Sequence, residues 1–174
     1  MNNNKPNKTK FYVTWSLVAM FLVSLTIALV MVSNYKKDDS KQRYKLTQIY
    51  KDVKDSDYQI DMKRGAAVYQ NYCLQCHGQQ AQGLRPYPAL AGSETLQGPM
   101  LVPLKIVLHG IRGNRGIMPG YKNLNYLDIT HVLNYVRNNF GNHAETIHPV
   151  ETIKAKIDTL SRKTPYTRDE LNSK

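Results

Sequence analysis

The chain contains two cysteines, Cys73 and Cys76, and His77 directly follows the second. Three kinds of site use cysteines at this spacing. A structural zinc site needs four closed protein ligands, and the chain has no second cysteine pair to complete one. A thioredoxin-like redox pair is expected near a βαβ pattern, which is not apparent here. The third, C-x-x-C-H, is the attachment signature of c-type haem, and the sequence favours it.

The spacing of these three residues has a physical reason. Residues three and four apart share one face of a helix, so Cys73, Cys76 and His77 can meet one flat ligand together. The two sulfurs would form thioether bonds to the porphyrin, and the imidazole would bind the iron. We therefore expect one covalent haem c as the cofactor, with His77 as a metal ligand.

Met118 is the preferred candidate for the second axial ligand. It precedes a proline within the glycine-rich stretch "HGIRGNRGIMPGY", which predicts a loop from Gly113 to Tyr121 that could fold across a haem face. A thioether is a soft iron ligand, and His/Met ligation raises the reduction potential. Met100 and His109 are the rival ligands, and a core methionine is the alternative role for Met118.

The segment from Asp61 to Gly141 resembles a class I cytochrome c domain. It is most similar to the small bacterial type found in membrane-anchored subunits or fused to respiratory enzymes. The stretches that carry the resemblance are "GAAVYQNYCLQCHG", "YPALAGS", "MPGY" and "LDITHVLNYVRNNFGN". The resemblance implies an all-α fold, with three to five short helices around one haem and a loop from Gln79 to Ala91.

The resemblance also implies roles for individual residues. Gly65 would let the first helix approach the last, and Tyr69 and Tyr135 would pack where they cross. The Pro88 carbonyl would accept a hydrogen bond from the imidazole of His77, and Leu90 would line the haem wall. Plain core packing is the alternative for each. Many relatives have a tryptophan near the haem propionates, but the only one here is Trp15, so we expect tyrosines or Arg112 and Arg115 to serve instead.

The N-terminal region predicts a membrane anchor. Residues 11–33 carry no charge, and at 1.5 Å per residue they would span roughly 35 Å, enough for a bilayer core. A cleavable signal peptide has a shorter apolar core and a small-residue cleavage site. Counting Lys and Arg on both sides mildly favours the opposite orientation. The family resemblance instead implies a haem domain facing the periplasm from the bacterial inner membrane.

The remaining boundaries follow from composition. We expect a cytoplasmic tail at 1–10, a charged and partly helical tether at 34–60, the haem domain at 61–141, and a tail at 142–174. In that tail Val150, Ile153, Ile157 and Leu160 form one helical stripe. This helix would either pack on the haem domain or dock on a partner.

The charge of the chain limits the kinds of partner that it is expected to bind. The formal net charge is +11, and residues 61–141 hold eight basic and three acidic residues. An exported haem protein is a poor nucleic-acid binder, so we expect a redox partner with an acidic docking face. The predicted basic rim consists of Arg85, Arg112, Arg115 and Lys122.

Two functions fit these features. The first is a membrane-anchored carrier of single electrons between respiratory partners; it is not itself an enzyme, and no small-molecule substrate binds its iron. The alternative is a haem-bearing subunit of a stable respiratory complex, such as a terminal oxidase, a nitrite reductase or a periplasmic dehydrogenase. A haem enzyme or gas sensor is disfavoured, because no extra distal His or Arg motif is apparent.

Overall fold

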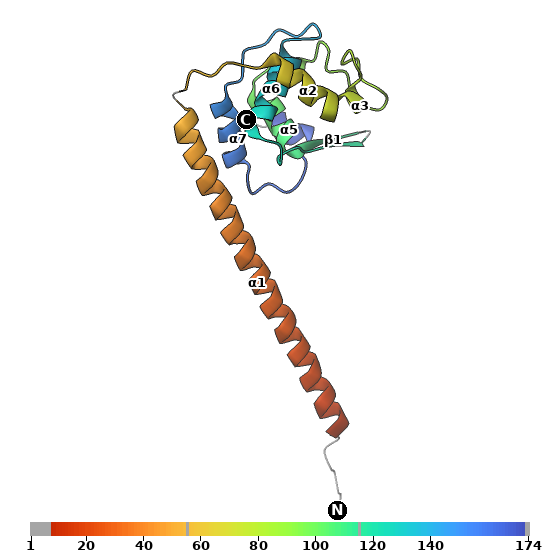
Figure 1. Cartoon of the computed structure of the whole chain (residues 1–174). Helices are drawn as coiled ribbons and strands as arrows, with labels where there is room; N and C mark the ends of the chain where they lie inside the picture. The colour runs from red at the N-terminus through yellow and green to blue at the C-terminus, as the bar shows by residue number, and fades with distance from the viewer. Residues whose placement is uncertain (1–7, 55, 115, 173–174) are drawn as a thin grey trace, which may run out of the picture. The chain divides into compact units, whose positions relative to one another are not determined.

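The computed structural model describes residues 8–54, 56–114 and 116–172, with side chains from residue 17 onward (Figure 1). The chain divides into two compact units, one ending at Gln42 and the other beginning at Arg43. The first seven residues of the expected cytoplasmic tail, the side chain of Trp15 and the rim residue Arg115 lie outside the described residues. The fold is mostly helical, as predicted, with one small sheet.

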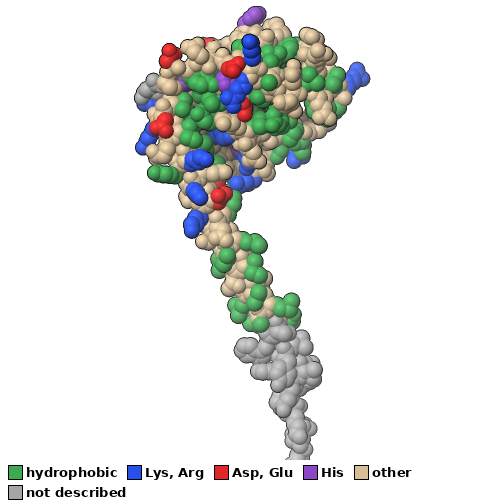
Figure 2. All heavy atoms as spheres, viewed as in Figure 1, with side chains coloured by type: hydrophobic (Ala, Val, Ile, Leu, Met, Phe, Trp, Pro, Cys, Tyr) green, Lys and Arg blue, Asp and Glu red, His purple; other side chains and the backbone are tan. Residues whose placement is uncertain are grey.

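The first helix, α1 (Lys8–Val53), is continuous across the segments expected as anchor and tether. The predicted tether is thus helical as far as Val53. From Leu17 to Val32 its large apolar side chains are exposed, as Figure 2 shows along the described part of this helix. The charged residues that follow have helix-compatible side chains and no proline, so nothing in the sequence ends the helix there.

Among the described residues, eight further elements follow α2 (Met62–Tyr72) in chain order. They are α3 (Leu74–His77), α4 (Glu94–Gln97), α5 (Leu101–His109), β1 (Gly110–Gly113), β2 (Gly116–Pro119), α6 (Tyr126–Arg137), α7 (Pro149–Asp158) and α8 (Arg168–Asn172). The Asp61 side chain accepts a hydrogen bond from the Arg64 backbone and so caps α2. Asn125 caps α6 in the same way through Leu127.

Helices α2 and α6 cross closely, and the crossing depends on Gly65. A Cβ at this position would lie 2.7 Å from the Cβ of Tyr135 and would collide with the His131 carbonyl. Beside the crossing, the rings of Tyr69 and Tyr135 lie 5.8 Å apart, and Phe140 contacts both. This aromatic cluster joins the two ends of the cytochrome-like segment.

The tail helix α7 packs on α5 and α6. Its residues Ile153 and Ala155 are buried, and Thr152 shares a 2.7 Å hydrogen bond with Thr130 of α6. The sequence left two roles open for this helix, and the structure shows the first: α7 packs on the domain and is not free to dock elsewhere through its buried face. The Lys156 ammonium group also donates to the carbonyls of Lys122 and Leu124, which ties α7 to the loop after β2.

The segment before α2 is held in place through a buried histidine, His131. The backbone N–H of Asp61 donates to its Nδ1 at 3.1 Å, and its Nε2 lies 2.6 Å from the Tyr58 hydroxyl. Because Nδ1 accepts, the ring is neutral and Nε2 carries the proton. Burial accordingly lowers the pKa of His131.

Candidate functional site

The C-x-x-C-H motif folds as a single helical turn at the end of α2. The N–H groups of Cys76 and His77 both donate to the Cys73 carbonyl, at 3.2 and 2.9 Å. Cys73 and Cys76 are both half-buried, and of the two only Cys73 is among the residues that line a pocket. Burial, with a smaller contribution from Cys76, raises the pKa of the Cys73 thiol to about 11.

His77 is buried, with 6% of its surface exposed, and it lines the same pocket. Its Nδ1 lies 2.9 Å from the Pro88 carbonyl oxygen, which can only accept, so Nδ1 carries a proton. Burial lowers the pKa of His77, and the bond to Pro88 opposes that shift. The ring is therefore neutral, and its Nε2 lone pair is available to a metal in the pocket.

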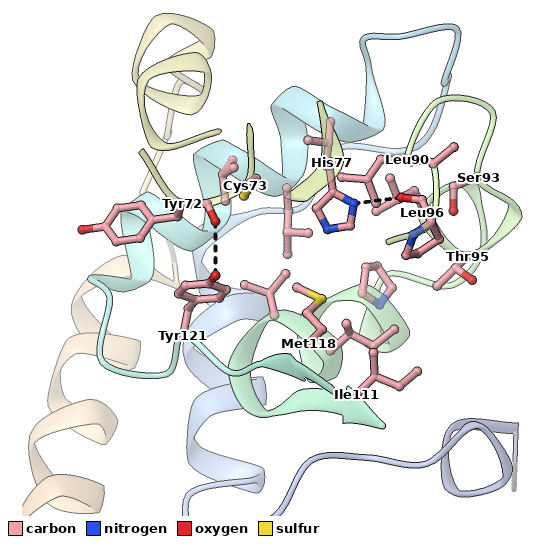
Figure 3. A pocket seen from close by; sticks show the side chains of 18 of the residues that line it. Tyr72, Cys73, His77, Leu90, Ser93, Thr95, Leu96, Ile111, Met118 and Tyr121 are labelled. Atoms are coloured by element: carbon pink, nitrogen blue, oxygen red, sulfur yellow. Dashed lines mark hydrogen bonds between the residues drawn. The ribbon is translucent and has the colours of Figure 1, made fainter. Parts of the chain in front are cut away.

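Met118 lies on the opposite side of this pocket, and its side chain points toward His77 (Figure 3). It was expected in an irregular loop, but it lies on strand β2 of a short antiparallel hairpin. Ile111 of β1 is its partner in the register and lines the pocket beside it. The glycines on both strands let the hairpin form: Gly110 adopts φ +81°, and a Cβ there would collide with the Met118 carbonyl.

The two rival ligands lie elsewhere. Met100 is partly buried against the hydrophobic core and does not line the pocket. His109 is buried at the end of α5, where its Nε2 lies 2.8 Å from the Thr159 hydroxyl. That hydroxyl donates to the Ala155 carbonyl, so Nε2 of His109 must carry a proton and donate to it. The structure therefore brings together His77 and Met118 and leaves the rivals outside.

The pocket between them is largely apolar. Its aliphatic walls come from four helices and two loops: Val68, Leu90, Leu96, Pro103, Ile106, Val107, Leu124, Val132, Leu133 and Val136. At one end, the Tyr121 hydroxyl donates to the Tyr72 carbonyl at 3.1 Å beside Cys73. The hydroxyls of Ser93 and Thr95 lie at the other end (Figure 3). A flat apolar ligand with polar groups at one edge suits this lining.

Three residues that the sequence predicted to take part in cofactor binding lie outside the pocket lining. Gly65, Tyr69 and Tyr135 lie at the helix crossing and do not line the pocket. The Tyr69 hydroxyl donates to the Gly78 carbonyl at 2.6 Å, which links that crossing to the end of α3. Any contribution of these three residues to cofactor binding is therefore indirect.

The sequence analysis predicted no role for two arginines that lie near the pocket. Arg137 is buried, and its guanidinium donates to the carbonyls of Leu96, Gly98 and Glu145. Arg168 of α8 lines the pocket although it is far away in the sequence. Only the helix-end position of Arg137 was visible in the sequence, and nothing local marks Arg168. Of the predicted rim, Arg85, Arg112 and Lys122 are exposed.

Residues 60–136 match the family model described as "Cytochrome C oxidase, cbb3-type, subunit III". This match coincides with the segment that builds both faces of the pocket. The chain carries a class I cytochrome c domain. The match indicates a haem-carrying, electron-transferring protein, as the sequence analysis predicted. Within the described ranges, no group of three or more His, Cys, Asp or Glu side chains could hold a metal ion by itself.

The residues of the cytochrome c domain fit the haem group in chemistry as well as in shape. A neutral imidazole and a thioether face each other, Cys73 lines the edge of the pocket, and the walls are apolar. Outside this domain, the described residues include one helix that is long and apolar enough to cross a bilayer. Its apolar window, within Leu17–Val53, has a mean hydropathy of 2.3 and no part of it is buried. This helix fits a membrane anchor.

Proposed function

We propose that this protein is a membrane-anchored c-type cytochrome that carries single electrons between respiratory redox partners. The observation that carries the proposal is the facing pair of His77 and Met118 across an apolar pocket, with Cys73 at its edge. Cys73 and Cys76 would hold one haem through thioethers. When bound, haem supplies an iron that cycles between the ferric and ferrous states.

Each residue near the pocket has a defined task in this proposal. His77 offers Nε2 to the iron, because its Nδ1 proton is committed to the Pro88 carbonyl. Met118 offers its thioether from β2, which favours ferrous iron and raises the potential. Leu90 and the other aliphatic side chains exclude water. With His77 and Met118 as its ligands, the iron would offer no site for a small-molecule substrate.

The helix from residue 11 to 33 holds the domain at the bacterial inner membrane, and the haem domain faces the periplasm. The exposed apolar side chains of this helix support its insertion in lipid. The orientation rests on the resemblance to exported cytochromes. A redox protein with an acidic face is the partner that the basic surface of the domain suits.

A second candidate function is that of a permanent subunit in a respiratory complex. It is favoured by the description of the matching family, which is a subunit of a cbb3-type oxidase. The two candidates differ in the size of the particle that mild detergent releases from native membranes. A free carrier would migrate alone, whereas a subunit would migrate with its complex and its oxidase activity.

Met118→Ala tests the proposed ligation, with Met100→Ala as the matched control. The full chain is purified from membranes in detergent, and its oxidised spectrum is recorded in the region of the weak methionine–iron charge-transfer band. We expect the band in wild type and in Met100→Ala. In Met118→Ala we expect it to vanish and the reduction potential to fall, because the soft ligand is lost. A wild type without haem would refute the proposed function, and a band that survives in Met118→Ala would refute the ligand.

A further inference from the structure

The C-terminal segment after α7 returns to the hairpin that carries Met118. The Tyr166 N–H donates to the Gly110 carbonyl at 3.0 Å, and the Arg112 N–H donates to the Tyr166 carbonyl at 2.7 Å. These bonds form a parallel bridge between Tyr166 and Ile111, which pairs with Met118 on its other side. Residues beyond the matched family segment thus extend the sheet at the edge of the pocket.

Side chains on both sides of position 168 hold this segment in place. The guanidinium of Arg162 lies 3.6 Å from the centre of the Tyr166 ring. The same guanidinium donates to both carboxylate oxygens of Glu170, at 2.8 and 3.0 Å. That carboxylate also accepts from the Thr167 N–H at 2.8 Å. Because Tyr166, Thr167 and Glu170 are all fixed, the backbone at Arg168 is fixed as well.

Arg168 is the one residue with a formal charge among the described residues that line the pocket. It lies two residues beyond Tyr166, which pairs with Ile111. Figure 3 shows Ile111, Ser93 and Thr95 at the end of the pocket away from Cys73. Because the backbone at Tyr166 pairs with Ile111, the Arg168 guanidinium can reach this end, where it would suit a carboxylate that it can bind with two parallel hydrogen bonds.

The other arginines near this end are unsuited to that task. The buried Arg137 guanidinium is already committed to three backbone carbonyls. Arg112, which the sequence suggested for this role, is exposed on β1 and does not line the pocket. Trp15, the only tryptophan, belongs to α1 and not to the cytochrome c domain.

We propose that Arg168 binds a propionate carboxylate of the haem at the end of the pocket that holds Ser93 and Thr95. The inference rests on the proposed function. The thioethers and the propionates occupy opposite edges of a c-type porphyrin, so attachment at Cys73 directs the carboxylates to the far end. There Arg168 supplies the charge, and the hydroxyls of Ser93 and Thr95 supply additional donors.

A fixed positive charge at this place affects the redox equilibrium. It disfavours the ferric state, which carries one more positive charge than the ferrous state, although water screens part of the interaction because Arg168 is exposed. Arg168 therefore raises the reduction potential. Its loss makes the haem easier to oxidise.

Arg168→Gln tests the proposal, with Lys154→Gln as a control that removes one exposed positive charge from α7. The full-length haem-loaded chain is titrated potentiometrically in detergent. At a fixed ambient potential, we expect the ratio of oxidised to reduced haem to be several-fold higher in Arg168→Gln than in Lys154→Gln. Arg168→Lys, which keeps the charge, is expected to recover most of the wild-type potential. Equal potentials in the two glutamine variants would overturn the proposal.

A second measurement reports on the carboxylate itself. In redox-induced infrared difference spectra, the propionate carboxylate bands should shift in Arg168→Gln and stay in place in Lys154→Gln. Unchanged bands in Arg168→Gln would overturn the assignment even if its potential moved. The wild-type spectrum separates the two proposals. A Met-ligated wild type with an unaffected Arg168→Gln refutes only the role of Arg168, whereas a wild type without haem refutes both.

Discussion

The described domain buries three histidines, and their hydrogen bonds distinguish a ligand from a core residue. His131 uses both ring nitrogens on protein partners, Asp61 and Tyr58. His109 donates Nε2 to Thr159 and does not line the pocket. His77 commits only Nδ1, to the Pro88 carbonyl, and lines the pocket. The second ring nitrogen, more than burial, therefore distinguishes His77 as the candidate iron ligand.

The burial of His109 predicts a pH-dependent stability. Desolvation, helped by the nearby cations Lys122, Arg162, Lys163 and Lys156, lowers its pKa from 6.5 to about 4. Between these values the unfolded chain binds a proton that the folded chain does not, so stability falls as the pH falls. We expect a loss of up to about 2 kcal/mol across this range.

The measurement is urea unfolding of wild type and His109→Gln at a series of pH values, since glutamine can still donate to Thr159. The free energy of unfolding of wild type should fall more steeply below pH 6.5 than that of the variant, with 6.5 as the ordinary pKa of the group. The lowered pKa of His131 affects wild type and variant equally, so it does not alter the difference between their unfolding free energies. Parallel curves would show that His109 is not responsible.

At the level of elements, local spacing was enough to predict part of the site. The C-x-x-C-H turn, the order of the helices around it and the non-helical backbone at Met118 could all be predicted from residues close together in the sequence. The hairpin was missed because its strands are only four residues long each and their glycines carry no strand pattern. The pairing of Tyr166 with Gly110 and the approach of Arg168 were missed for another reason: each joins residues far apart in the chain.

The crossing of α2 and α6 gives a test at the same scale. Alanine is about 1 kcal/mol better than glycine in a helix, so Gly65→Ala would stabilise α2 if the position were open. The structure predicts the opposite, because the new Cβ would meet the Tyr135 Cβ at 2.7 Å and the His131 carbonyl. We expect a loss of about 1–3 kcal/mol from overpacking.

Circular dichroism during urea unfolding measures this change. Ala67→Ser, an exposed substitution two residues further along α2, is the control and should alter stability by less than about 0.5 kcal/mol. A more stable Gly65→Ala would mean that the helices do not approach each other as closely as described.

For the whole molecule, the distribution of charge matters more than its total. Lysines and arginines are spread over α1, the cytochrome c domain and the tail, so the net charge of +11 identifies no docking face by itself. Two exposed cations lie close to the segment that holds the cysteines. Lys122 follows Tyr121, which bonds to the Tyr72 carbonyl, and Arg85 follows Leu84, whose N–H donates to the Cys76 carbonyl at 3.2 Å. Of the predicted rim, we expect these two to attract an anionic partner to the end of the pocket that holds Cys73.

Stopped-flow oxidation of the reduced chain by ferricyanide, a small anionic oxidant, tests the electrostatic attraction at Arg85 and Lys122. The test does not require the native partner. We expect Arg85→Glu with Lys122→Glu to slow the reaction several-fold at low salt. The loss should shrink as ionic strength rises past about 0.1 M, where the screening length is about 10 Å. The control, Lys63→Glu with Lys154→Glu, makes the same change in net charge at exposed positions on α2 and α7. Equal slowing in both variants would show that net charge alone governs the encounter, because a local field would distinguish them.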